Sequence, residues 1–562
     1  MSFSICPRVK NAKAFDGSFR FPSLRVFTVG QGDRFFRALR AFCPDLFVET
    51  ATDKDANVIL SVASVFSSQN EFCQLRILGE RMEIRCRDEA GARNAAAILA
   101  QLIRRDGDAW VLPCGQIEDW PDASYRAMML ESSGRSWLSM ERIYLYVRQM
   151  ALARMNVLQF HFMENPGCTI ALDCYPDWHG YGPDNLKYTK DEIRALIAYA
   201  DEMGISITPF VEVLSHSTAF NRAADIACPG DDDPGMYAVC VGQEKTFEAI
   251  DRVLTEIAEL FPDPVLHIGA DEYDMSMVTP RTVYWDRCPH CRALAKERGY
   301  TTLRELFFYA IERINRMVNA KGKVAMMWNA DLKPGEIPDE IRRNIVIHFY
   351  RCNNTLGREM VFDLWPNGYA EDGFSVLNSY YHDTYMDLSR YVRAERVNSW
   401  NFLASPLVAP EHRASVIGGC CCAWDSFVHY ERTIPPAILL FGDRLWNAFG
   451  APVPYDRAYG LAMTHLLFEG KLPEDVNLLD VLGDALPPLE DKVLFHKDKL
   501  FTPPTEIARI RDELNRLAEA EGDTPIGGLA RIYAAVASEA YDFRVESLKN
   551  PDPRKGSIPF EG

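Results

Sequence analysis

The sequence predicts an α/β protein in which a (β/α)8 TIM barrel is preceded by a small α+β domain and followed by a helical extension. From Tyr125 onward, short apolar runs of strand length alternate with longer amphipathic helical stretches. Eight such runs occur before about residue 450, and a closed barrel needs eight strand–helix units. After Gly450 the apolar runs stop and helical patterns continue. We therefore predict domains at residues 1–118, 119–450 and 451–562.

The N-terminal domain shows both strand and helix patterns. Residues 57–64 form an apolar run of strand length, and residues 75–86 predict a hairpin that turns at Gly79-Glu80. The Ala-rich stretch at 89–104 predicts a helix. Residues 115–122 are expected to form the linker to the barrel.

The barrel region supplies strands and helices in alternation. The predicted strands are residues 126–131, 156–162, 205–213, 265–271, 324–329, 345–350, 374–379 and 416–424. Amphipathic helical patterns lie between them at residues 139–155, 190–203, 244–260 and 302–319. Beyond the barrel, residues 506–521 and 528–548 predict the helices of the C-terminal extension.

The composition of the 562-residue chain excludes several classes of partner. Its net charge of −18 argues against nucleic acid, because phosphate binding needs a basic surface. The sequence contains no run of 18 apolar residues, so no membrane span is expected. The 15 cysteines are not spaced as a disulfide framework and no signal-peptide pattern is present, so we expect a cytoplasmic protein with reduced thiols. An oligomer is compatible with the sequence, which leaves the oligomeric state open.

Polar and aromatic residues recur at the C-terminal ends of the predicted strands, which surround the active site in a barrel. The acidic and histidine residues are Glu131, His161, Glu164, Glu212, His216, His267, Asp271, Glu272, Asp387 and Asp425. The aromatic residues are Trp328, Tyr350, Tyr385 and Trp424. Each of them alone is commonly a structural residue, but their convergence at one end of one barrel indicates a binding site. Because aromatic side chains stack on sugar rings and carboxylates bind hydroxyl groups, we expect a carbohydrate pocket.

The end of the fourth predicted strand carries a family resemblance. The segment His267-Ile-Gly-Ala-Asp-Glu272 resembles the His-x-Gly-Gly-Asp-Glu signature of glycoside hydrolase family 20, the β-N-acetylhexosaminidases, with Ala270 in place of a glycine. Further family patterns occur in the expected order at Arg126…Glu131…Arg135, 156–161, 188–192, 209–216, 385–387 and Trp424. Phe210, Tyr350 and Asp425 depart from the family pattern, which leaves the selection of the sugar open.

This resemblance implies an exo-acting, retaining β-N-acetylhexosaminidase that removes terminal β-linked GlcNAc or GalNAc from glycans. In the family the 2-acetamido group of the substrate is the nucleophile and forms an oxazolinium intermediate, so no cofactor is needed. The resemblance implies Glu272 as general acid and base, Asp271 as the residue that orients the acetamido group, and Tyr385 as a hydrogen-bond donor to it. The residues expected to bind the sugar or support the site are Arg126, His161, Glu164, His216, Trp328, Tyr350, Asp387, Trp424 and Asp425.

A cysteine pattern lies close to this region of the chain. Cys288-Pro-His-Cys291 is a Cys-x-x-Cys motif after the fourth predicted strand, and Cys228 and Cys240 follow the third. Because consecutive barrel loops are neighbours in space, the four thiolates could form a structural zinc site. The alternative is four cysteines without a ligand.

Two other functions remain open from the sequence. A metal-dependent barrel hydrolase could use His161, His216 and His267 as ligands, although no His-x-His occurs on the first predicted strand. A catalytically silent relative could bind a sugar without cleaving it, although all three implied catalytic residues are present.

Overall fold

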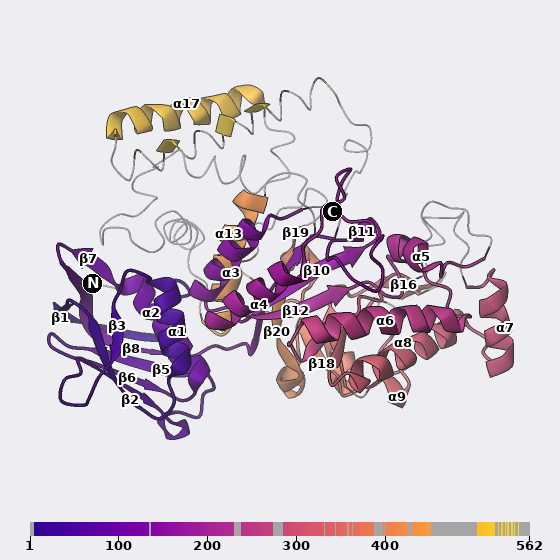
Figure 1. The fold of residues 1–562 in the computed structure, drawn as a ribbon, viewed down its shortest axis with the longest axis horizontal. Helices are drawn as coiled ribbons and strands as arrows, with labels where there is room; N and C mark the ends of the chain where they lie inside the picture. The colour runs from indigo at the N-terminus through magenta and orange to yellow at the C-terminus, as the bar shows by residue number, and fades with distance from the viewer. Residues whose placement is uncertain are drawn as a thin grey trace.

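The computed structural model describes residues 5–133, 137–229, 238–273, 285–450 and 503–522, with gaps at 331, 343, 357–358, 362–363, 387–396, 398–399 and 425–429, and with scattered positions between 527 and 549. The N-terminal domain and the strand barrel lie next to each other, and helix α17 (Pro504–Glu521) is set apart from both in the view of Figure 1. The helix predicted at 506–521 is therefore confirmed. Residues 451–502 lie outside the described part of the chain.

The N-terminal domain is a mixed sheet with two helices. Its strands follow the order β1 (Asn11–Phe21), β8 (Ala109–Asp119), β5 (Cys73–Ile77), β6 (Met82–Cys86), β4 (Val58–Val62), β2 (Leu24–Val29) and β3 (Val48–Thr50), and β7 (Arg104–Asp106) pairs with β8. Helices α1 (Asp33–Phe42) and α2 (Glu89–Leu102) pack together, and α2 packs on β5 and β6. The prediction of a linker at 115–122 is wrong for residues 115–119, which end β8 and pair with β5. The alternating burial along Gln116-Ile117-Glu118 is the period of a strand.

Eight parallel strands close into the predicted barrel. In order around the ring they are β9 (Tyr125–Glu131), β10 (Val157–Glu164), β12 (Ser206–Val211), β13 (Val265–His267), β14 (Val324–Trp328), β15 (Ile345–Phe349), β18 (Ser375–Asn378) and β20 (Val416–Ala423). The ring closes where β20 pairs in parallel with β9. The (β/α)8 fold is therefore confirmed, and each of the eight predicted strands is present.

Helices cover the outside of the barrel. They include α3 (Met140–Leu152), α4 (Lys190–Glu202), α6 (Glu244–Leu260), α8 (Leu303–Ala320) and α13 (Tyr430–Trp446), most of which are visible in Figure 1. Helix α4 illustrates why they form: Thr189 and Glu192 make a capping box at its start. Its buried residues Ile193, Leu196 and Ala200 are three and four positions apart, so they share one face. None of the helices in the described ranges is long and apolar enough to cross a membrane.

Buried arginines join the N-terminal domain to the barrel. Arg126, the second residue of β9, forms an ion pair with Glu71 at 2.7 Å between Nη2 and Oε2. Arg154, which follows α3, pairs with Asp119 at the end of β8. Arg93 of α2 donates hydrogen bonds to backbone carbonyls of the barrel. Because breaking a buried charge pair is strongly destabilising, these contacts fix the two domains against each other.

Candidate active site

Four aromatic side chains gather at the C-terminal end of the barrel. Trp328 ends β14, Tyr350 follows β15, Tyr385 begins β19 (Tyr385–Met386), and Trp424 follows β20. The ring centroid of Trp328 lies 5.2 Å from that of Tyr350, 6.2 Å from that of Tyr385 and 5.7 Å from that of Trp424. All except Tyr385 are buried. The structure thus brings these four predicted residues into one cluster, which we call the aromatic wall.

The chain turns sharply after β13. Gly269, Ala270 and Glu272 have φ angles of +66°, +67° and +54°, in the left-handed region. A Cβ atom at position 269 would overlap Oε2 of Glu212, so this position requires glycine. The backbone N–H of Ala270 donates to the same Oε2 at 3.2 Å. This turn directs two consecutive carboxylates, those of Asp271 and Glu272, to one histidine.

That histidine is His216, which follows β12. Its Nε2 lies 3.7 Å from Oδ2 of Asp271 and 3.6 Å from Oε2 of Glu272. Its Nδ1 lies 2.8 Å from Oε1 of Glu164, at the end of β10. Glu212 is buried beside them and completes a group that we call the carboxylate cluster: Glu164, Glu212, Asp271 and Glu272 around His216.

Burial and charge shift the titration of this cluster. Burial raises the pKa of Glu212 well above its ordinary value, and the charge of Asp271 adds to the rise. Burial by itself would lower the pKa of His216, but the charges of Asp271 and Glu164 raise it to about 9. Burial also raises the pKa of Asp271, while the charges of His216 and Arg351 oppose the rise. At neutral pH, His216 is therefore a cation among carboxylates.

Residues that follow β15 contact Glu272 on its other oxygen. The Tyr350 hydroxyl donates to Oε1 of Glu272 at 3.4 Å, and Arg351 forms an ion pair with the same oxygen. The Arg351 guanidinium also lies 4.4 Å from the centroid of the Tyr350 ring. Sequence reasoning missed Arg351, although its place directly after a barrel strand is the signal that identified Tyr350.

Two buried polar atoms of the site have no hydrogen-bond partner among the described residues. They are Oδ1 of Asp271 and Nε1 of Trp328. Because nearly all buried polar atoms in proteins are paired, these two atoms are available to a partner from outside the described residues, such as a bound ligand. Burial raises the pKa of Tyr385 well above its ordinary value, so its hydroxyl keeps its proton and can donate. The site therefore offers a ligand the buried acceptor of Asp271, the buried indole N–H of Trp328 and the partly buried hydroxyl of Tyr385, a set that suits an amide group.

His161 lies in the barrel interior next to the aromatic wall. It is completely buried, and its ring stacks on Phe210 with centroids 4.0 Å apart. The edge contact with Trp424 has a centroid distance of 5.3 Å. This packing makes His161 a support for the aromatic wall.

His267 braces the end of β13. Its Nδ1 accepts the backbone N–H of Gly269 at 3.0 Å, and its Nε2 is hydrogen-bonded to Nδ1 of His348 at 3.0 Å. Within the described ranges, the histidine trio of the metal-hydrolase alternative does not come together as a ligand set, which removes the geometric basis of that alternative. A different predicted set does come together: Cys228, Cys240, Cys288 and Cys291.

The sequence predicts that Arg126 binds sugar hydroxyls, and this prediction is wrong. As the second residue of β9, Arg126 lies at the amino-terminal end of the barrel, opposite the mouth. Its guanidinium is buried and bound to Glu71 and to backbone carbonyls. The predicted residues Asp387 and Asp425, and Arg135 beyond the first strand, lie outside the described residues.

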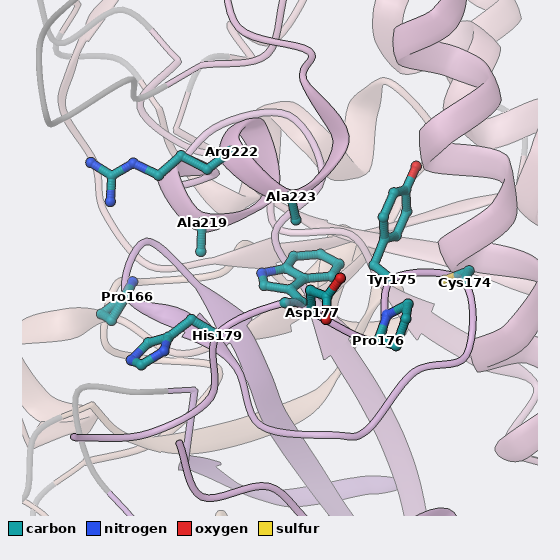
Figure 2. Close-up of a pocket in the computed structure, with 10 residues that line it drawn as sticks. Pro166, Cys174, Tyr175, Pro176, Asp177, His179, Ala219, Arg222 and Ala223 are labelled. Carbon is teal, nitrogen blue, oxygen red and sulfur yellow. The ribbon is translucent and has the colours of Figure 1, made fainter. Parts of the chain in front are cut away.

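A cavity of about 420 Å³ lies between the segment after β10 and helix α5 (Thr218–Ala224). Tyr175 and Arg222 line it from opposite sides in Figure 2. Pro166, two residues after Glu164, also lines it, so the cavity lies close to the Glu164 end of the carboxylate cluster. The cavity is separate from the mouth of the barrel, because its lining includes neither the aromatic wall nor the carboxylates.

The chain is similar to known proteins both in sequence and in fold. The sequence model of the glycosyl hydrolase family 20 catalytic domain matches residues 124–448. Beta-hexosaminidase of Vibrio furnissii is 29% identical over 381 residues, which are 61% of this chain and 59% of that protein. Beta-hexosaminidase of Porphyromonas gingivalis is 24% identical over 434 residues, which are 72% of this chain and 54% of that protein. The chain therefore spans less than two thirds of the length of these curated relatives.

Solved structures share the fold of the chain at low sequence identity. The exo β-N-acetylglucosaminidase of Vibrio harveyi in complex with N-acetylglucosamine has a TM-score of 0.70 and 21% identity, over 82% of this chain and 76% of that chain. The β-N-acetylhexosaminidase of Bacteroides fragilis has a TM-score of 0.69 and 22% identity, over 83% and 95%. The chitobiase of Flavobacterium johnsoniae has a TM-score of 0.67 and 18% identity, over 99% and 94%.

Proposed function

Because the chain belongs to glycosyl hydrolase family 20, we propose that it is an exo-acting β-N-acetylhexosaminidase that releases terminal β-linked GlcNAc or GalNAc with retention of configuration. The 2-acetamido oxygen of the substrate is the nucleophile in this proposal. One observation carries it: Asp271 and Glu272 lie side by side at the barrel mouth, and a buried oxygen of Asp271 has no partner among the described residues. The names of the curated relatives agree with this substrate class.

Asp271 has the chemistry to recognise the amide of the sugar. An acetamido N–H would supply the donor that Oδ1 of Asp271 lacks among the described residues. The protonated hydroxyl of Tyr385 would donate to the acetamido oxygen. Holding the amide in this way would direct its oxygen at C1, which converts the attack into an intramolecular step. The negative charge of Asp271 would stabilise the positive charge of the oxazolinium ring.

Glu272 would transfer the proton in both steps of the reaction. In the first step its carboxyl group protonates the glycosidic oxygen while the acetamido oxygen attacks C1, so the C1–O bond breaks and the alcohol leaves. In the second step its carboxylate accepts a proton from water as the water oxygen attacks C1 and the ring reopens to the acetamide. His216, Tyr350 and Arg351 contact this carboxylate and would hold it in position between the two steps.

The aromatic wall would make the pocket fit one terminal sugar. Trp328 is completely buried and Trp424 is 8% exposed, so these rings pack tightly at the end of the barrel. Aromatic rings stack on the apolar faces of sugars, and a pocket that they wall off would suit an exo-acting enzyme.

The first test compares p-nitrophenyl β-GlcNAc with p-nitrophenyl β-glucoside, which lacks the acetamido group. We expect kcat/KM to be at least about 1000-fold higher for the GlcNAc compound, because only this substrate carries the nucleophile. Proton NMR of the first product formed should show the β-anomer. Equal hydrolysis of the two glycosides, or inversion at C1, would contradict substrate assistance.

The second test replaces Glu272 with glutamine, which keeps the shape of the side chain and removes its acidity. We expect kcat on p-nitrophenyl β-GlcNAc to fall at least about 100-fold, the size of a general acid–base contribution. The matched control is Glu371→Gln at the end of α10 (Pro366–Glu371), where the glutamate side chain is 67% exposed. If Glu272→Gln has the turnover of the control, Glu272 is not the acid. If the wild-type chain binds GlcNAc without hydrolysing any of these substrates, it is a sugar-binding relative.

A further inference from the structure

We propose that Cys228, Cys240, Cys288 and Cys291 bind one zinc ion that fixes two loops at the mouth of the barrel. Their four sulfur atoms lie within 4.8 Å of one another, and all four residues are buried. The Sγ of Cys240 lies 3.5 Å from that of Cys288 and 3.8 Å from that of Cys291. Four sulfurs bound to zinc at about 2.3 Å form a tetrahedron with edges of about 3.8 Å. The two Cys240 distances are therefore close to an edge of a tetrahedral zinc site, and the other pairs lie within 4.8 Å.

The same distances distinguish this cluster from a pair of disulfides. A disulfide brings two sulfurs to about 2.05 Å. The sulfur of Cys240 is almost equally far from those of Cys288 and Cys291, so the geometry selects no pair. One atom bound to all four sulfurs accounts for this arrangement, whereas two separate bonds do not.

The two halves of the cluster come from consecutive barrel loops. Cys288 precedes helix α7 (Pro289–Arg298) and Cys291 lies in its first turn, where the positive end of the helix favours thiolates. Cys228 and Cys240 are each adjacent to a residue of the isolated antiparallel bridge between Ala227 and Val239. Each pair of cysteines therefore lies next to hydrogen-bonded backbone, one pair at the start of a helix and the other beside a β-bridge.

Gly242 allows the two halves to meet. A Cβ atom at this position would overlap the backbone of His290 and Cys291. The chain after β12 therefore lies directly against the Cys-x-x-Cys turn, at a distance that only glycine permits. This close approach joins the loops that follow β12 and β13.

Two short connections link the cysteine cluster to the proposed active site. Val239, next to Cys240, donates its N–H to the carbonyl of Leu214 at 3.0 Å, two residues before His216. Its carbonyl accepts the indole N–H of Trp285 at 2.8 Å. The Trp285 ring stacks on Tyr273, the residue after Glu272, with centroids 4.8 Å apart. The zinc would therefore anchor the segments that carry both His216 and Glu272.

The metal content of the purified wild-type chain is the direct test. After purification without chelators or a metal-binding tag, elemental analysis should find about one zinc per chain. Cys288→Ser and Cys291→Ser should each lose most of the zinc, whereas Cys43→Ser, which alters a half-buried cysteine outside the cluster, should keep it. Less than about 0.1 zinc per chain, or iron in its place, would overturn the proposal.

A measurement on the wild-type chain covers the case in which the serine variants fail to fold. Growth in cobalt-supplemented medium should place Co(II) in the cluster, with the absorption of tetrahedral cobalt and of thiolate-to-cobalt charge transfer. A cobalt-loaded chain that shows octahedral cobalt only would also overturn the proposal.

The anchoring role has its own readout. Removal of zinc with a mercurial and a chelator, followed by a thiol, should lower kcat at least about tenfold while KM changes less than about twofold, and added zinc should restore kcat. This step rests on the role proposed for Glu272, whereas the zinc content does not, so the two can fail separately. A zinc-free chain with full kcat would overturn the anchoring role.

Discussion

Replacing His216 with asparagine tests the electrostatics of the carboxylate cluster. His216 is the cation between Glu164 and the two proposed catalytic carboxylates. It has a φ angle of +48°, which asparagine tolerates better than most residues. The substitution therefore removes the charge with little added backbone strain.

The magnitude follows from the pKa of His216, which is about 9 in the folded chain against an ordinary value of 6.5. Because the folded value is the higher one, this histidine stabilises the fold fully below pH 6.5, and the contribution is lost as the pH rises through 9. The interval between the two values, at about 1.4 kcal/mol per pH unit, corresponds to about 3 kcal/mol. The side chain is 13% exposed, so solvent screening removes little of this contribution.

NMR of the chain labelled with ¹³C in its 11 histidines measures the pKa directly. The resonance that is absent in His216→Asn should titrate near 9 in the wild type. In urea unfolding, the stability advantage of the wild type over His216→Asn should fall by about 3 kcal/mol between pH 6 and pH 9.5. His412→Asn controls for the loss of an imidazole, because His412 lies in the short helix η2 (Pro410–Ser415) before β20 and so at the end of the barrel opposite the mouth. A titration midpoint below about 7, or an advantage that is independent of pH, would refute the electrostatic account of the cluster.

Two further substitutions test the geometry around the site. Gly269→Ala combines left-handed strain with overlap between Cβ and Glu212, so calorimetry should show a loss of about 2 kcal/mol or more in unfolding free energy. Gly299→Ala, also left-handed but facing open space, should lose only about 1 kcal/mol, and equal losses would contradict the role of crowding. Arg126→Met should lower stability by about 3 kcal/mol through the broken ion pair with Glu71. Its KM for p-nitrophenyl β-GlcNAc should stay within about twofold of the wild-type value. A tenfold rise in KM would show instead that Arg126 binds the sugar.

The sequence predicts the barrel because strands and helices differ in length and in the spacing of their apolar residues. The fourth strand shows a limit of this prediction, because the spacing of apolar residues does not give the point at which the strand ends. Residues 265–271 are predicted as one strand, but β13 stops at His267 because Gly269 and Ala270 leave the β region of φ and ψ. Gly269 is a residue type that favours such a turn, but Ala270 carries no preference for left-handed angles, so residue type does not reveal how far the turn extends. The same turn is what places Asp271 and Glu272 next to His216.

The mistaken role of Arg126 has a related cause. Arg126 and Glu131 lie on the same strand, and polar residues at both of its ends look alike in the sequence. The direction of the strand already places Arg126 opposite the mouth, because this residue begins the predicted strand. Its role at the sugar came from the family resemblance alone. Arg351 was missed although it closely follows a barrel strand, because its contact with Glu272 joins positions on different strands and is not visible in the sequence.

The strained turn after β13 shows how the proposed acid is held. Ala270 and Glu272 adopt left-handed angles that cost of order 1–3 kcal/mol each, so such residues persist only where neighbouring groups stabilise them. Glu212, after β12, accepts the N–H of Ala270, and the N–H of Trp328 on β14 donates to the carbonyl of residue 269 at 3.1 Å. Arg351, after β15, pairs with the carboxylate of Glu272. Because these contacts come from three other strands, the barrel as a whole sets the orientation of Glu272. A change at any of the three partners should therefore disturb catalysis even where the partner does not touch the substrate.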